Sequence, residues 1–82
     1  MSKYNPLAIY FKNLGTQSLR ISFSEIEKIL GSKLPSSAYT RKEWWANDSV
    51  SHPQSKCGWL LGGWKVETIE LNRREILFTT LK

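Results

Sequence analysis

With 82 residues, the chain has room for one small domain, residues 1–82, and none for a second hydrophobic core. Hydrophobic residues make up 40% of the sequence and aromatic residues 12%, which excludes an intrinsically disordered chain. The sequence contains no run of about 18 apolar residues and no signal-peptide core, so we expect a cytoplasmic protein without a membrane partner. The formal net charge of +5 fits an anionic partner such as nucleic acid, although ordinary solubility explains it equally well.

The first predicted element is a helix over residues 4–14. Asn5 is the expected N-cap, Pro6 lies in the first turn, and Gly15 follows the last turn. Apolar residues recur at steps of three and four, which gives one hydrophobic stripe. The stripe consists of Tyr4, Leu7, Tyr10, Phe11 and Leu14.

A short strand and a second helix follow. Residues 19–23 alternate between apolar and polar with a period of two, which predicts the strand. Ser24 and Glu27 have the spacing of a capping box, in which the serine side chain accepts from the Glu27 N–H and the glutamate reaches back. Gly31 then ends the helix.

Residues 38–45 favour a third, short helix, with a strand as the alternative. Arg41 and Lys42 lie in its middle, and Trp44 and Trp45 at its end. The two indole rings favour a place in the core, because each aromatic side chain buries about 150–250 Å². The alternative is a platform on which bases stack.

The stretch from Trp44 to Trp64 holds all four tryptophans, the only histidine and the only cysteine. We expect a helix over residues 53–62 in it, with His52 as N-cap and a glycine pair at its end. At 100° per residue, its core face consists of Cys57, Leu60, Leu61 and Trp64. Its opposite, outer face carries Ser55 and Trp59, flanked by Lys56 and His52. Trp59 therefore either packs under the hairpin or is exposed as a contact.

The C-terminal part predicts a β-hairpin. Residues 65–71 and 76–81 alternate as strands, and residues 72–75 form a basic turn. Pairing of the strand at 19–23 with this hairpin gives a three-stranded antiparallel sheet. The predicted fold is therefore α+β with three or four helices, and its element order resembles that of a winged helix.

A second resemblance covers nearly the whole chain. It rests on Tyr4-Asn-Pro-Leu7, Phe23-Ser-Glu-Ile-Glu-Lys-Ile-Leu-Gly31, Leu34-Pro-Ser-Ser-Ala38, Trp44-Trp-Ala-Asn47, His52-Pro-Gln54 and Gly63-Trp64-Lys-Val66. These segments are similar to a small bacterial domain family of unknown function. The resemblance implies no activity and no catalytic or binding residue. Members often have an arginine near the position of Tyr39 or Thr40, whereas here the arginine is Arg41.

The outer face of the predicted helix 53–62 is the main candidate site. The winged-helix layout implies that its N-terminal end enters the groove of a nucleic acid, with duplex DNA as the expected partner. The hairpin tip at residues 72–75 and the basic pair before Trp44 are expected to hold phosphates. The candidate residues are His52, Gln54, Ser55, Lys56, Trp59, Arg41, Lys42, Arg73 and Arg74.

The sequence does not favour an enzyme. His52 is the only histidine and Cys57 is assigned to the core face, so a Cys–His nucleophile lacks its geometry. Ligands for zinc are too few, and we expect no metal and no cofactor. The alternative function is a protein-interaction module, such as an accessory protein of a phage or mobile element, that docks through exposed tryptophans.

Overall fold

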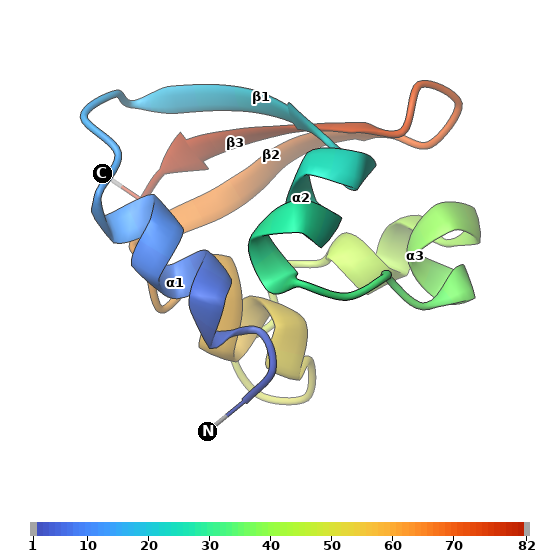
Figure 1. Cartoon of the computed structure of the whole chain (residues 1–82), viewed down its shortest axis with the longest axis horizontal. Helices are drawn as coiled ribbons and strands as arrows, with labels where there is room; N and C mark the ends of the chain where they lie inside the picture. Colours follow the sequence, from blue (N-terminus) through green and yellow to red (C-terminus); the bar gives the residue numbers. More distant parts are fainter. Residues whose placement is uncertain (1, 82) are drawn as a thin grey trace.

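The computed structural model describes residues 2–81 and shows an α+β fold. A three-stranded antiparallel sheet has the helices on one of its faces (Figure 1). The elements are α1 (Asn5–Lys12), β1 (Ser18–Ser22), α2 (Phe23–Leu30), α3 (Ser36–Thr40), the 3-10 helix η1 (Lys42–Trp45), the π-helical turn η2 (Ser55–Trp59), β2 (Trp64–Glu70) and β3 (Glu75–Thr80).

The predicted sheet is confirmed, including the pairing of the early strand with the hairpin. The strand order is β1-β3-β2, so β3 is central and β2 is an edge strand. Phe78 of β3 pairs with Leu19 of β1 on one side and with Val66 of β2 on the other. A β-bulge between Val66 and Thr68 shifts the register of the hairpin toward its turn.

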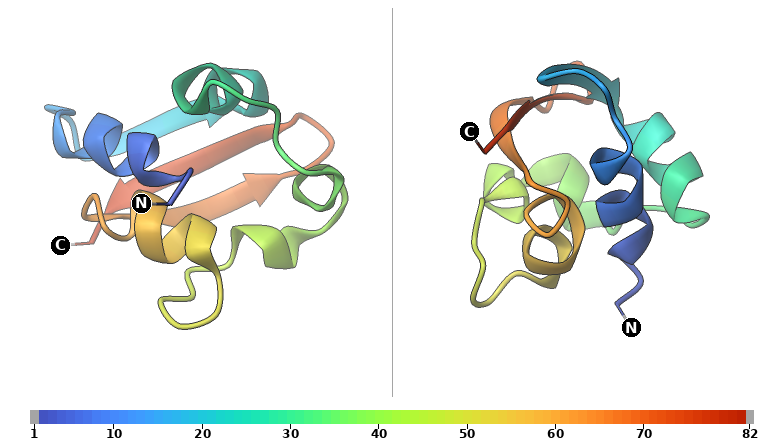
Figure 2. Two further views of the ribbon diagram at one scale, coloured as in Figure 1. Left: turned by 60° about the horizontal axis from the view of Figure 1, so that its bottom comes forward. Right: turned by 90° about the vertical axis from the view of Figure 1, so that its left-hand side faces the viewer.

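The core lies between the sheet and the helical layer (Figure 2). The predicted stripe of α1 is confirmed at Leu7 and Phe11, each 1% exposed, and these pack with Ile76 and Phe78 of β3. Phe11 stacks on Trp64 with ring centroids 5.3 Å apart. Asn5, however, is the first helical residue and not the cap; its amide donates to the carbonyl of Cys57 at 3.1 Å.

The capping box of α2 lies two residues earlier than predicted. Ser22 accepts from the Glu25 N–H at 3.2 Å, and the Glu25 carboxylate accepts from the Ser22 N–H at 3.1 Å. The prediction was wrong because Ser22–Glu25 and Ser24–Glu27 both have the motif's spacing. Extended backbone at Ser22 lets the helix begin directly where β1 ends. The predicted end is confirmed at Gly31, whose φ of 76° is left-handed.

The helix predicted for residues 38–45 is two short helices. Arg41 separates them with extended backbone, φ −129° and ψ 122°. The break lets Ala38 of α3 and Trp45 of η1 both face the core, where the Trp45 indole donates to the Ala38 carbonyl at 2.8 Å. Within the described residues 2–81, no helix has the length and apolar character needed to cross a membrane.

Candidate nucleic-acid interface

The segment after Pro53 is helical, but it is not the regular helix predicted for residues 53–62. Its middle is a wide π-helical turn, and Gly58 has non-helical backbone at φ −102°, ψ −108°. A face calculated at 100° per residue therefore fails along this segment. Leu61, assigned to the core face, is 51% exposed, and Cys57 is only partly buried.

Three of the predicted contact residues on this segment are buried. Gln54, Ser55 and Trp59 are 6%, 0% and 0% exposed, so their assignment to an outer face was wrong. The Gln54 amide donates to the Trp44 carbonyl at 2.8 Å. The Trp59 indole donates to Asn47 Oδ1 at 3.0 Å. These side chains anchor the preceding loop and are not available to a groove.

Glycines explain which face of the segment turns inward. A Cβ on Gly62 would lie 2.9 Å from both the Ala8 carbonyl oxygen and Phe11 Cβ of α1. A Cβ on Gly58 would lie 3.5 Å from Leu7 Cδ1. The buried side is therefore the one that lets α1 approach closely. The sequence pattern used Gly62 only as a helix end and gave Gly58 no role.

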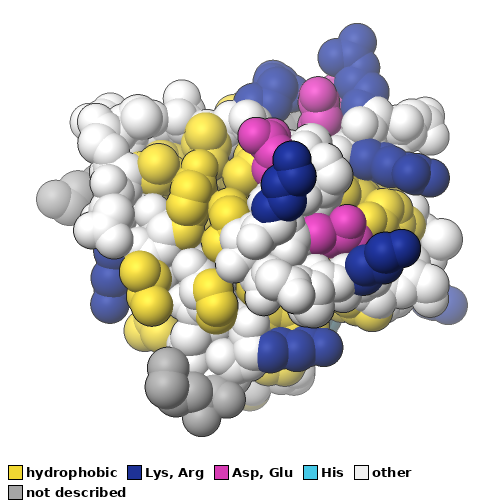
Figure 3. Space-filling model, in the orientation of Figure 1, with side chains coloured by type: hydrophobic (Ala, Val, Ile, Leu, Met, Phe, Trp, Pro, Cys, Tyr) yellow, Lys and Arg dark blue, Asp and Glu magenta, His cyan; other side chains and the backbone are white. Residues whose placement is uncertain are grey.

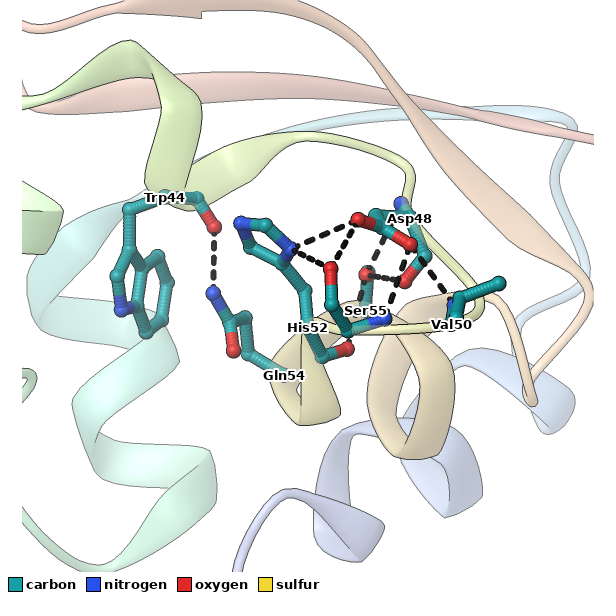
Figure 4. Close-up of polar contacts among 7 residues, drawn as sticks. Trp44, Asp48, Val50, His52, Gln54 and Ser55 are labelled. Atoms are coloured by element: carbon teal, nitrogen blue, oxygen red, sulfur yellow. Dashed lines mark hydrogen bonds and ion pairs between the residues drawn. The ribbon is translucent and has the colours of Figure 1, made fainter.

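Asp48 organises the loop before this segment (Figure 4). Its Oδ1 accepts from the N–H groups of Val50 at 2.8 Å and Ser51 at 3.1 Å. Its Oδ2 accepts from the Ser51 hydroxyl at 2.5 Å and lies 3.0 Å from His52 Nδ1. The Ser51 hydroxyl, these N–H groups and His52 hold the pKa of the carboxyl well below its usual range.

The Asp48, Ser51 and His52 side chains do not have the geometry of a catalytic triad. Ser51 Oγ and Asp48 Oδ2 both lie near the same ring nitrogen of His52, Nδ1, at 3.3 and 3.0 Å. In a triad, the serine and the carboxylate contact opposite ring nitrogens. Among residues 2–81, no three His, Cys, Asp or Glu side chains gather as a metal would require.

The tryptophans form part of the core. Trp45, Trp59 and Trp64 are at most 3% exposed, and Trp44 is partly buried. Trp59 stacks on Trp45 with centroids 5.7 Å apart and packs under the hairpin at Phe78. The predicted core position is thus confirmed for Trp45, whereas Trp44 is partly buried and packs against the core. The four tryptophans do not form the exposed patch expected for the alternative function.

The other predicted basic residues lie at the start of η1 and in the β2–β3 turn, and Lys42 and Arg73 line one cleft. We call the hairpin end the group Arg41, Lys42, Asn72, Arg73 and Arg74, all of which are exposed. The chain turns at residues 71–74 between β2 and β3, close to the predicted turn. Figure 3 shows Lys and Arg side chains mainly toward this side, and hydrophobic side chains gathered at the opposite side over α1 and β1.

Arg74 is held in place by Tyr39 and by its own backbone. Its guanidinium carbon lies 5.2 Å from the centre of the Tyr39 ring, a cation–π contact. Its φ of 54° is left-handed, which is uncommon for a residue other than glycine. Its carbonyl accepts from the Phe23 N–H at 2.9 Å and so connects the turn to α2.

Tyr39 is held by a hydrogen bond to Glu27. Glu27 was predicted to cap α2, but Glu25 takes that role. The Tyr39 hydroxyl donates to Glu27 Oε2 at 2.5 Å, and the Leu34 N–H donates to the same oxygen at 2.9 Å. Both bonds lower the pKa of the Glu27 carboxyl, and the first raises the pKa of the Tyr39 hydroxyl.

A cleft of about 520 Å³ lies between Lys42 and the hairpin. Its lining residues are Lys42, Thr68, Ile69, Glu70, Leu71, Asn72 and Arg73. Two of these were predicted as site residues from segments far apart in the sequence, and the structure brings them together. Sequence reasoning missed Glu70, whose Oε1 lies 3.8 Å from Arg20 and 3.9 Å from Arg73.

Comparison with known proteins gives one family assignment. No curated protein matches the chain. No solved structure matches it either, and the winged-helix interpretation is not confirmed. Residues 4–80 match the family described as a domain of unknown function, DUF7662, and the chain belongs to this family.

Proposed function

We propose that this domain is a non-enzymatic nucleic-acid-binding module whose contact surface is the hairpin end. The observation that carries the proposal is the meeting of Lys42 and Arg73 in one cleft; Arg41 and Arg74, their neighbours in the sequence, are both exposed. Basic side chains on one side of a small domain with a formal net charge of +5 are the electrostatic footprint of a phosphate-binding surface.

The proposed contact surface is the hairpin end and not the predicted helix 53–62. On the segment after Pro53, Lys56 is exposed, His52 is partly buried against Asp48, and Gln54, Ser55 and Trp59 are enclosed. A helix whose side chains hold its own loop has few groups to offer to bases. The side chains of the hairpin end are exposed. Their internal contacts are those of Arg74 with Tyr39 and of Arg73 with Glu70.

Two charge-matched variants test the assignment. Fluorescence anisotropy with labelled DNA and RNA should show binding that weakens about 20- to 40-fold between 50 and 200 mM salt, if three phosphates are contacted. Arg73→Gln should weaken binding and lower the salt slope by about one. Lys56→Gln removes the same charge from the other segment and should change the affinity less than twofold. A larger loss of affinity for Lys56→Gln than for Arg73→Gln would place the site on the segment after Pro53. Absence of binding by the unmodified protein would reject the proposed function.

A protein-interaction module is the alternative proposal. The support for it is the hydrophobic surface over α1 and β1 in Figure 3, together with Ile9 of α1, which is 59% exposed. Such a surface favours a protein partner when it is contiguous. Absence of nucleic-acid binding, together with concentration-dependent self-association abolished by Ile9→Ser, would favour this alternative.

A further inference from the structure

The cleft at the hairpin end follows the free edge of the sheet. β2 is an edge strand, so the backbone groups on its outer side have no strand partner. At Val66 this edge is satisfied by Asn47, whose side chain accepts from the Val66 N–H at 2.8 Å and donates to its carbonyl at 2.9 Å. The cleft lies further along the same strand, from Thr68 to the turn, with Lys42 facing it.

The lining combines three kinds of group that a nucleotide requires. Ile69 and Leu71 supply an apolar surface, and the Asn72 amide supplies a donor and an acceptor. Lys42 and Arg73 supply positive charge, and the Arg73 side chain is 74% exposed. The volume of about 520 Å³ falls within the range of roughly 300–1,000 Å³ that small-molecule sites occupy.

Arg74 adds a planar group beside this cleft. Its guanidinium carbon lies 5.2 Å from the centre of the Tyr39 ring, and Arg74 is exposed. Unstacked bases pack on guanidinium planes as well as on aromatic rings. Arg74, which follows Arg73 of the lining in the sequence, is therefore a candidate for stacking against a base at the end of the cleft.

We infer that the cleft at the hairpin end binds single-stranded nucleic acid in preference to a duplex. This inference rests on the proposed function and names the class of nucleic acid that the same site takes. A cleft lined by one strand edge and its turn suits one extended strand with splayed bases, whereas major-groove readout by a recognition helix requires exposed side chains on that helix. The buried Gln54, Ser55 and Trp59 leave no such helix after Pro53.

Glu70 provides a test with a gain of binding. One carboxylate oxygen of Glu70 is closed to solvent, and it lies 3.8 Å from Arg20 and 3.9 Å from Arg73 in the cleft wall. Its negative charge opposes a phosphate and draws Arg73 toward the protein. Removal of this charge should therefore strengthen nucleic-acid binding. A variant that merely misfolded would lose binding instead.

The experiment compares single strands and a duplex of about 12 nucleotides, a length within the usual site sizes. Anisotropy with labelled DNA and RNA of one sequence should give at least tenfold tighter binding to a single strand than to the duplex. Glu70→Gln should tighten single-strand binding about threefold or more. Glu67→Gln makes the same charge change on the same strand outside the cleft lining and should have a smaller effect.

Loss-of-charge variants complete the test. Lys42→Gln should weaken single-strand binding about threefold to tenfold, and Lys12→Gln on α1 should weaken it less than twofold. Equal or tighter binding of the duplex, or cleft variants that behave like their controls, would overturn the inference and leave nucleic-acid binding intact. Absence of binding to every oligonucleotide would reject the proposed function as well.

Discussion

Asn47 and Asp48 are adjacent polar residues that hold the chain between η1 and η2. Asn47 pairs with the edge of β2 at Val66 and accepts from the Trp59 indole. Asp48 closes the following turn through two backbone N–H groups and the Ser51 hydroxyl. Their side chains thus take the place of secondary structure in a loop that has none, because buried or turning backbone requires partners.

Replacement of the carboxylate tests this role through pH. The folded state lowers the pKa of Asp48, so the charged form stabilises the fold above the ordinary aspartate pKa of about 3.9, and this contribution is lost as the pH falls. Asp48→Asn should therefore lower the melting temperature at pH 7, and the difference from the parent should shrink below about pH 4. Glu67→Gln is the control for a lost carboxylate. A difference between Asp48→Asn and the parent that is equal at pH 7 and pH 3 would contradict this account.

The segment from Pro53 to Gly63 shows, at the scale of one element, how glycine decides a helix face. Its inward side carries Gln54, Ser55, Gly58, Trp59 and Gly62, a set with one large apolar residue. Packing against α1 requires the two glycines, and hydrogen bonds satisfy the two polar side chains. The close approach to α1 therefore defines the inward face, and Leu61 remains 51% exposed.

A methyl group at Gly62 tests the close approach. Its Cβ would lie 2.9 Å from backbone and side-chain atoms of α1, so α1 must move away from the segment. Gly62→Ala should lower the free energy of unfolding by about 1–3 kcal/mol in a urea titration, the usual effect of overpacking. Gly15→Ala, where a Cβ meets nothing within 4 Å, should change it by less than about 0.5 kcal/mol. Equal effects at the two positions would show that the contact is not tight.

Sequence patterns predicted the elements whose apolar residues repeat and failed where glycine and polar residues face the core. The stripe of α1 and the alternation of β1, β2 and β3 identified those elements within one or two residues. The capping box failed because two serine–glutamate pairs overlap, and only the strand end at Ser22 distinguishes them. Of the candidate site, the pattern located Arg73 and Arg74 in a turn, but it had no signal that Lys42 would line the same cleft as Arg73.

At the scale of the whole molecule, the proposed function depends on which end faces the partner. The side chains of the helical layer mostly make contacts within the protein. Trp45 and Trp59 form part of the core, and the polar side chains of Gln54 and Ser55 hydrogen-bond to the preceding chain. The hairpin end instead combines an open cleft with basic side chains from η1 and from the β2–β3 turn. We therefore propose that the sheet edge and its turn bind the partner and that the helices support the fold.

The most direct measurement of this assignment is the change in backbone amide chemical shifts when a labelled protein is titrated with a single-stranded oligonucleotide. The account predicts the largest shifts at residues 68–74 and at Lys42, with small shifts at residues 52–59. Dominant shifts at residues 52–59, with residues 68–74 unchanged, would contradict it.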